Sequence, residues 1–346
     1  ELLDKFYDRS WEEPWQAEEF PELAAWHERY SEHLDRLQPR PQHKTFYTPR
    51  IQESAKSTAL VLMMPLTINY GRDLARWWLQ RATLRLSAGD VDGACEDVLA
   101  VRRLALFLEK GPLLLDLLVG NATEAVAQET LFKLAGDPRL TKQQAVEFRR
   151  ELAARPPRPD PLEMIDVGER YVCLDGICGM VRGGPDSLQG LSWAAGGGMG
   201  DVLDSLLGAD SKNVEGAIKD SIEEVREGLT PDERRRRQLK LIYDAIDWDL
   251  VLATCNDYFD RLHALADIKD PQVRAEKLRE LREEIESLGD FESLADLPQS
   301  VPAENRRTFS RHIAGGFVGL FTSSIHASVR ASQRAETQDV LADLAF

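Results

Sequence analysis

Charged and amide side chains gather on two predicted helices in the second half of the chain. In the helix predicted over residues 231–266, Asp249, Asn256 and Asp260 border an apolar stripe. The helix predicted over residues 162–182 carries charges of both signs that can face them. The candidate polar cluster comprises Glu169, Arg170, Asp175, Arg182, Asp249, Asn256, Asp260 and Arg261.

Two kinds of chemistry suit this cluster. Opposite charges on neighbouring helices offset the hydration that each loses, which favours an inter-helix network of salt bridges and hydrogen bonds. The same carboxylates lie near His263, so a metal site or an acid–base site is the alternative. We favour the network, and we name no catalytic residue in the cluster.

Motifs of catalysis and cofactor binding are absent from the sequence. The six histidines include no pair four residues apart and no HExxH motif, so a zinc hydrolase has no support. Neither the Glu-x-x-His spacing of di-iron bundles nor the GxSxG turn of many serine hydrolases occurs. The Gly-rich tract over residues 183–208 lacks the Lys-Ser/Thr of a P-loop, and we predict a mobile loop there. The sequence therefore predicts no metal and no cofactor.

The cysteines are too few and too scattered for a disulfide framework. They are Cys95, Cys173, Cys178 and Cys255. On a continuous helix Cys173 and Cys178 project in different directions, so they can pair only if the backbone turns between them. No CxxC pair supports a zinc knuckle. Three or four buried free thiols are expected.

The composition argues against nucleic acid and against a membrane-spanning segment. The chain has 346 residues and a net charge of −16, whereas phosphate binding needs clustered Lys and Arg. The basic run at residues 234–237 suits a solvated helix face. The longest apolar runs, residues 58–66 and 112–120, are shorter than the ~20 residues that a membrane helix needs.

Residues 74–108 are predicted to form two antiparallel helices. Apolar residues recur at intervals of three and four on both segments, Gly89 ends the first, and Asp90 can cap the second. The large, small and turn residues resemble those of one tetratricopeptide unit. However, Arg81 and Arg85 replace apolar residues of that motif, and no further copy follows. These two arginines form a candidate interaction surface, facing either acidic side chains of a neighbouring helix or a partner.

The remaining pattern predicts an all-α fold made of an irregular array of antiparallel helical hairpins, tetratricopeptide-like in the first half. Trp11 and Trp15 belong to an N-terminal arm that is expected to pack over the first helices. Four prolines within residues 155–161 interrupt the helices and mark a connection. The predicted parts are residues 1–154 (arm and hairpins), 155–161 (Pro-rich connection) and 162–346 (second helical subdomain, with helices near 162–182, 231–266, 270–288 and 303–346).

Several motifs together resemble a family of helical, tetratricopeptide-like planctomycete proteins of unassigned function. They are Gly111-Pro112 with Leu118-Val119-Gly120, Glu169-Arg170 with Leu174-Asp175 and Arg182-Gly183-Gly184, and Asp247-Trp248-Asp249 with Asn256 and Asp260-Arg261-Leu262. Family members tend to carry a membrane-spanning helix before this region, and many continue into a pseudopilin-like tail. The resemblance implies a membrane-anchored protein with its bulk on the extracytoplasmic, periplasmic side, trimmed here at both ends. It supplies no catalytic residue, and Cys173, Cys178 and the Gly-rich insert depart from it.

Two functional hypotheses follow. The first is a non-catalytic helical scaffold that binds a protein or peptide partner, with the membrane reached only through segments outside this chain. The alternative is a small-ligand-binding protein or an enzyme whose polar site lies between helices 162–182 and 231–266 and is closed by the Gly-rich loop.

Overall fold

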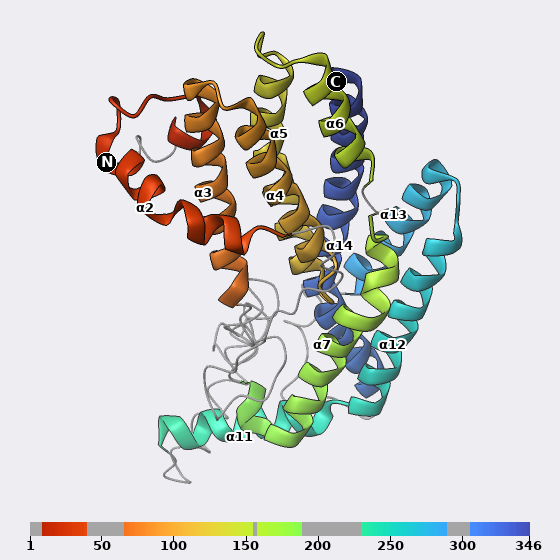
Figure 1. Cartoon of the computed structure of the whole chain (residues 1–346). Helices are drawn as coiled ribbons and strands as arrows, with labels where there is room; N and C mark the ends of the chain where they lie inside the picture. Colours follow the sequence, from red (N-terminus) through yellow and green to blue (C-terminus); the bar gives the residue numbers. More distant parts are fainter. Residues whose placement is uncertain (1–8, 40–65, 155–157, 189–229, 289–304) are drawn as a thin grey trace. The chain divides into compact units, whose positions relative to one another are not determined.

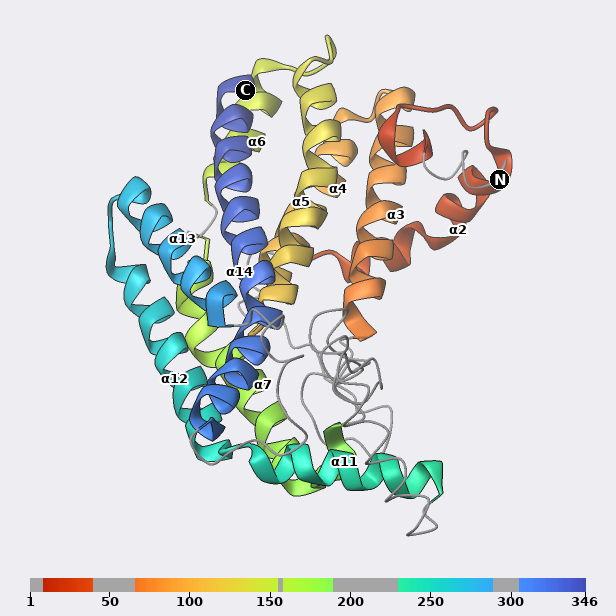
Figure 2. The same ribbon diagram turned by 180° about the vertical axis from the view of Figure 1, so that it is seen from behind.

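The computed structural model describes residues 9–39, 66–154, 158–188, 230–288 and 305–346. Every regular element in these ranges is a helix, as the two opposite views in Figures 1 and 2 show, which confirms the all-α class. The chain divides into two compact units: unit 1 comprises residues 1–51, 64–164 and 326–346, and unit 2 comprises residues 52–63 and 165–325.

Unit 1 combines consecutive helices with the end of the chain. It contains α2 (Pro21–Leu37), α3 (Leu66–Ala88), α4 (Val91–Glu109), α5 (Leu114–Ala135), α6 (Lys142–Ala153) and the last part of α14 (Arg306–Ala345). The sequence prediction placed residues 326–346 in the second subdomain. They belong to unit 1 because side chains of α14 bind helices there: Arg149 of α6 pairs with Asp343 at 2.7 Å, and the Phe148 and Phe346 rings lie 4.9 Å apart.

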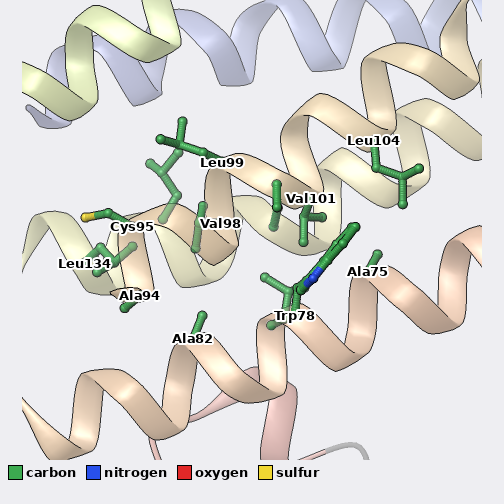
Figure 3. Close-up of a cluster of buried hydrophobic side chains, with 14 of the residues drawn as sticks. Ala75, Trp78, Ala82, Ala94, Cys95, Val98, Leu99, Val101, Leu104 and Leu134 are labelled. Atoms are coloured by element: carbon green, nitrogen blue, oxygen red, sulfur yellow. The ribbon is translucent and has the colours of Figure 1, made fainter. Parts of the chain in front are cut away.

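The predicted hairpin is present as α3 and α4. The turn between them needs Gly89, whose φ of +86° lies in the left-handed region that glycine adopts without strain. The Asp90 carboxylate then accepts the Gly93 amide at 2.9 Å and caps α4. Figure 3 shows Ala82 opposite Ala94, and Trp78 between the two helices. The small residues let the helices approach, and the indole of Trp78 donates to the Leu34 carbonyl of α2.

Helix α4 is the central helix of unit 1. It packs against α3, α5 and α6, and most of its residues are buried. On the α5 side, a Cβ at Gly120 would lie only 2.7 Å from the Ala105 carbonyl oxygen, so glycine permits the close approach of these two helices. The core of unit 1 forms around α4, in which only Asp92 and Glu96 are exposed.

The N-terminal arm packs on α3. Trp15 is buried, and its indole donates to the Gln80 carbonyl at 3.1 Å. The Thr83 hydroxyl donates to the Ser10 carbonyl at 2.7 Å. This confirms the predicted packing role for Trp15, since its ring covers the first helices and is not exposed to a ligand.

Unit 2 contains α7 (Pro161–Gly183) from Ile165 onward, the short 3-10 helices η2 (Pro185–Ser187) and η3 (Leu265–Asp267), α11 (Pro231–Ala245), α12 (Trp248–Ala264), α13 (Pro271–Leu288) and the first part of α14. The single helix predicted over residues 231–266 is wrong, because the chain breaks between α11 and α12. At the break the Asp247 carboxylate accepts the Leu250 amide at 3.0 Å, and the Asp247 amide donates to the Ser310 hydroxyl at 2.8 Å. These bonds make Asp247 the cap of a new helix.

Local hydrogen bonds mark where other helices begin. Helix α5 begins at Leu114, and the Asp116 carboxylate accepts the Leu113 amide before it. Thr141 and Thr230 form capping boxes at the starts of α6 and α11. The end of the chain forms one continuous helix, α14. Most of the Gly-rich tract lies outside the described residues, as do the first three residues of the Pro-rich connection.

Candidate functional site

Part of the predicted polar cluster forms between α7 and α12. The Arg170 guanidinium binds Asp260 of α12 at 2.7 Å and Asp166, one turn earlier on α7, at 2.5 Å. It also donates to the Asn256 side-chain oxygen at 2.9 Å and lies 6.0 Å from the centre of the Phe259 ring. Arg170 is therefore the centre of a polar contact between these two helices.

The other predicted residues are distributed around this contact. Asp175 pairs with the exposed Arg182 along α7 at 3.3 Å. Arg261 turns away from Arg170 and binds Glu284 of α13 at 2.8 Å. Asp249 is exposed, whereas Glu169 is buried. The eight residues thus occupy several places, because adjacent positions on one helix point about 100° apart.

The chemistry of this contact is that of an inter-helix tie. Two carboxylates balance the Arg170 charge, and its guanidinium serves only as a hydrogen-bond donor to both helices. Among the residues that the structure describes, no group of three or more His, Cys, Asp or Glu side chains could hold a metal ion. The arrangement suits structural stabilisation better than acid–base catalysis.

On the side away from its buried face, α7 carries a row of exposed apolar residues. Val167, Tyr171 and Val181 are 60%, 65% and 40% exposed. Leu174 is half-buried and Cys178 is exposed. Successive members of this row, which we call the α7 stripe, are four, three, four and three residues apart, so they lie along one line of the helix. The buried residues of α7, among them Ile165, Val172 and Ile177, lie on its other side.

The hairpin arginines bind acidic residues of their own unit. Arg81 is buried, and two of its guanidinium nitrogens donate to the Asp97 carboxylate of α4 at 2.6 and 3.0 Å. It also binds Asp35 of α2 at 2.7 Å and donates to Ser31. Arg85 adds a bond to Asp97 at 3.0 Å. The sequence left open whether these arginines face acidic side chains of a neighbouring helix or a partner. In the structure both bind acidic side chains of neighbouring helices, and Arg81 does not reach the surface.

Burial and charge shift the proton affinities in this region. Burial alone would lower the pKa of Arg81, but the hydrogen bonds and charge of Asp97 raise it above its usual value. Burial lowers the pKa of the neighbouring His27 from 6.5 to about 4, and the positive charge of Arg81 adds to this effect. His27 is therefore neutral at physiological pH. Both residues line a hollow of about 600 Å³ between α2 and α3.

A second buried ionic network was not foreseen from the sequence. Arg158, in the Pro-rich connection, binds Glu109 of α4 at 2.5 Å and Asp339 of α14 at 3.1 Å, and it also contacts Glu124 of α5. Arg102 of α4 binds Glu124 at 2.7 Å and Asp339 at 2.5 Å. The network joins four segments that are distant in sequence. An arginine between prolines gave no signal of which carboxylates would surround it.

This network borders a second hollow, of about 610 Å³, lined by residues of α4, α6, α14 and Arg158. Its two guanidiniums are outnumbered by the three carboxylates that bind them, so the hollow offers no spare positive charge for an anion. Burial would by itself lower the pKa of Arg158, yet the charges of Glu124, Glu109 and Asp339 raise it. These interactions favour a structural role.

Three of the four free thiols are buried, as expected, but the neighbours of Cys173 were not foreseen. Cys178 is exposed on the α7 stripe, whereas Cys95, Cys173 and Cys255 are buried, and all four are free. Interaction with the neighbouring Cys255 of α12, together with burial, raises the pKa of the Cys173 thiol of α7, and Cys255 donates to the Ala314 carbonyl of α14 at 3.7 Å. The sequence pattern drew attention to Cys173 and Cys178, which share a helix. It gave no indication that Cys173 faces Cys255.

Comparison with protein-family models, with curated proteins and with solved structures found no match to this chain. In the described part of the chain, no helix combines the length and the apolar character needed to cross a membrane. The functional argument therefore rests on the chain's own geometry.

Proposed function

We propose that this protein is a non-catalytic helical scaffold whose α7 stripe binds an amphipathic helix of a partner protein. The observation that carries the proposal is the exposed row of Val167, Tyr171, Leu174, Cys178 and Val181 on a helix whose opposite side is already buried. Scattered apolar residues are normal on a protein surface. A row that continues over four turns is a different feature, because it forms one continuous apolar strip about 21 Å long.

The spacing of the stripe selects a helical partner. Apolar residues separated alternately by four and three positions form the seam through which one helix packs lengthwise on another, knobs into holes. An extended peptide would instead match the two-residue period of a strand. The expected partner segment therefore carries its own apolar residues at alternating intervals of three and four.

Charge beside the stripe favours a basic partner. Glu163 is exposed on the border of the stripe, and Arg170 on the same border is held by Asp166 and Asp260, which are themselves 34% and 61% exposed at their side chains. Three carboxylates and one guanidinium leave this border acidic, in keeping with the chain's net charge of −16. Lysine or arginine flanking the partner's apolar seam would complement it.

The same features weigh against the alternative of an enzyme or small-ligand site between α7 and α12. The two terminal nitrogens of Arg170 are held there by Asp166, Asn256 and Asp260. The hollows described above are lined instead by residues of unit 1. A tie between helices positions α7, and in this proposal the stripe on its outer side does the binding.

The resemblance to tetratricopeptide-like planctomycete proteins supports a place for this scaffold on the extracytoplasmic side of the membrane, anchored through segments outside this chain. Protease is added to cells whose outer envelope layer is permeable but whose cytoplasmic membrane is intact. It should digest this protein and leave a cytoplasmic marker protein undigested. Equal protection of both proteins would contradict this location without affecting the α7 stripe.

Site-specific photo-crosslinking tests the partner proposal. A photoreactive phenylalanine analogue replaces Tyr171 in the full chain, expressed in its native cells, and the matched control carries it at Tyr70, which is 69% exposed on α3. Position 171 should crosslink to a helical segment with a three-and-four apolar pattern and basic flanks, and position 70 should not. Crosslinks only to a second copy of this chain, identical products at both positions, or no product would overturn the proposal.

A further inference from the structure

The two buried thiols in unit 2 come from different helices and meet in the core. Cys173 of α7 is 2% exposed and Cys255 of α12 is 0% exposed. The contacts around them fix the register of the two segments. Arg170, one turn before Cys173, binds Asn256, the residue after Cys255. Farther along, the Tyr243 hydroxyl donates to the Val181 carbonyl at 2.9 Å.

This register runs antiparallel, since positions later on α7 meet positions earlier in the α11–α12 region. It brings Cys173 close to Cys255, which raises the pKa of the Cys173 thiol, while the Cys255 thiol donates to the Ala314 carbonyl at 3.7 Å. A disulfide requires Cα atoms about 4.4–6.8 Å apart with the two Cβ atoms pointing toward each other. Cys173 and Cys255, which are both buried in unit 2 beside the Arg170–Asn256 contact, come closest to this geometry, whereas Cys95 lies in unit 1 and Cys178 is exposed.

We propose that Cys173 and Cys255 form a disulfide that links α7 to α12 when the protein folds in an oxidising environment. The oxidant is a disulfide of the thiol–disulfide exchange class, such as oxidised glutathione or an oxidised dithiol protein. One cysteine, as thiolate, attacks the oxidant and releases one thiol, forming a mixed disulfide. The second cysteine then attacks the bonded sulfur and releases the other thiol. Two cysteine thiols are thereby oxidised to one disulfide, and one disulfide is reduced to two thiols.

Because both thiols are buried, the disulfide must form during folding. In the closed fold neither thiol meets solvent, and the raised pKa of Cys173, caused by its hydrogen bond to Cys255 and by burial, keeps it protonated and unreactive. The exchange therefore takes place before α7 and α12 close on each other. Once formed, the bond closes a loop of roughly 80 residues, which restricts the unfolded chain. It also fixes the helix that carries the α7 stripe, although the inference does not depend on the proposed partner.

The experiment refolds the full chain from denaturant in a glutathione redox buffer, then blocks free thiols with iodoacetamide under denaturing conditions. Tryptic mapping without reduction locates the bond. Cys173 and Cys178 share one tryptic peptide, so the mapping uses the Cys178→Ser variant, and Cys95→Ser serves as a matched control. We expect the refolded and blocked chain to carry two carbamidomethyl groups fewer than the reduced and blocked chain, and the peptides that contain Cys173 and Cys255 to be crosslinked.

Thermal unfolding supplies a second readout. The oxidised protein should melt on the order of 5 °C or more above its reduced form. Cys255→Ala should abolish this difference, and Cys95→Ser should preserve it. Full alkylation of both Cys173 and Cys255 after oxidative refolding, or a bond from either of them to another cysteine, would overturn the proposal. If the Cys178→Ser variant fails to fold, fragmentation of the crosslinked peptide from the unmodified sequence shows whether Cys173 or Cys178 carries the bond.

Discussion

Helices α4 and α7 are both rich in apolar residues, yet they are used differently. Nearly every side of α4 is buried, and even its charged residues Asp97, Arg102 and Glu109 lie inside ionic networks. Helix α7 buries one side and leaves Val167, Tyr171 and Val181 exposed on the other. Apolar composition alone therefore does not distinguish a structural helix from one that offers a surface.

The two helices differ in how many other segments of the chain pack against them. Three helices from the chain itself pack around α4, and ionic networks join it to α2, α14 and the Arg158 segment. In unit 2, α12 reaches α7 through Arg170, which borders the α7 stripe, and through the buried Cys173, which lies on the other side of α7. Substitutions in α4 should therefore lower the stability of the fold, whereas substitutions in the α7 stripe should weaken partner binding.

The largest effect is expected when a buried charge loses its partner beside α4. Arg158→Ala removes the guanidinium that binds the buried Glu109, which is 0% exposed, and leaves Glu124, which is 1% exposed, with Arg102 as its remaining arginine. The free energy of unfolding should fall by about 3–5 kcal/mol. The matched change on α7 is Arg182→Ala, whose ion pair with Asp175 is at the surface and should contribute no more than ~1 kcal/mol. Urea unfolding followed by circular dichroism compares the two, and equal losses would contradict the distinction.

His27, packed against α3 in the same unit, should produce a pH-dependent effect of intermediate size. Its pKa is about 4 in the fold and about 6.5 when unfolded, so only the unfolded chain binds the proton between these values. The contribution of neutral His27 to the free energy of unfolding is fully present above pH 6.5. It decreases as the pH drops toward 4, and the free energy of unfolding is lower by about 2–3 kcal/mol at pH 4.5. His27→Gln should remove that share of the pH dependence. Unfolding free energies at pH 7 and pH 4.5 test this, and unchanged slopes in the variant would refute it.

The same conservative substitution can be placed on both helices for the smallest stability effect. Val98 of α4 is fully buried, and Val98→Ala should cost about 2 kcal/mol because two methyl groups leave a cavity. Val167→Ala on the α7 stripe should change stability by less than ~0.5 kcal/mol, since solvent already surrounds the side chain and alanine favours helix. Thermal unfolding of the two variants measures the contrast. A similar loss at both sites would mean that α7 is covered in solution.

Much of the fold could be predicted because it depends on local signals. The intervals of three and four over residues 74–108 predict the hairpin, and the capping side chains of Asp90, Thr141 and Thr230 act within three residues of their own positions. The all-α class follows from the same periodicity. The break at Asp247 was missed because an aspartate within an apolar pattern is also compatible with a continuous helix. Its capping role is completed by Ser310, which is remote in sequence.

The interactions that matter most for the site depend on contacts between distant segments. Arg158 finds Glu109, Glu124 and Asp339 only after α14 has packed onto unit 1. Cys173 likewise meets Cys255 only through the register of α7 and α12. The predicted polar residues were correctly located on two helices, but whether Arg170 or Arg261 faced the other helix depended on packing. The regular spacing of the α7 stripe is visible in the sequence, but its exposure to solvent depends on how the helices pack.

The most direct test of the α7 stripe asks whether it acts as one continuous seam. The photoreactive group at position 171 reports partner contact, while the substitution Val181→Asp places a charge three turns away on the same stripe, and Val146→Asp places one on the exposed surface of α6. The yield of the partner crosslink should fall at least about tenfold, or about 1.4 kcal/mol, with Val181→Asp and stay unchanged with Val146→Asp. Equal yields in the two backgrounds would contradict a helix docked along α7.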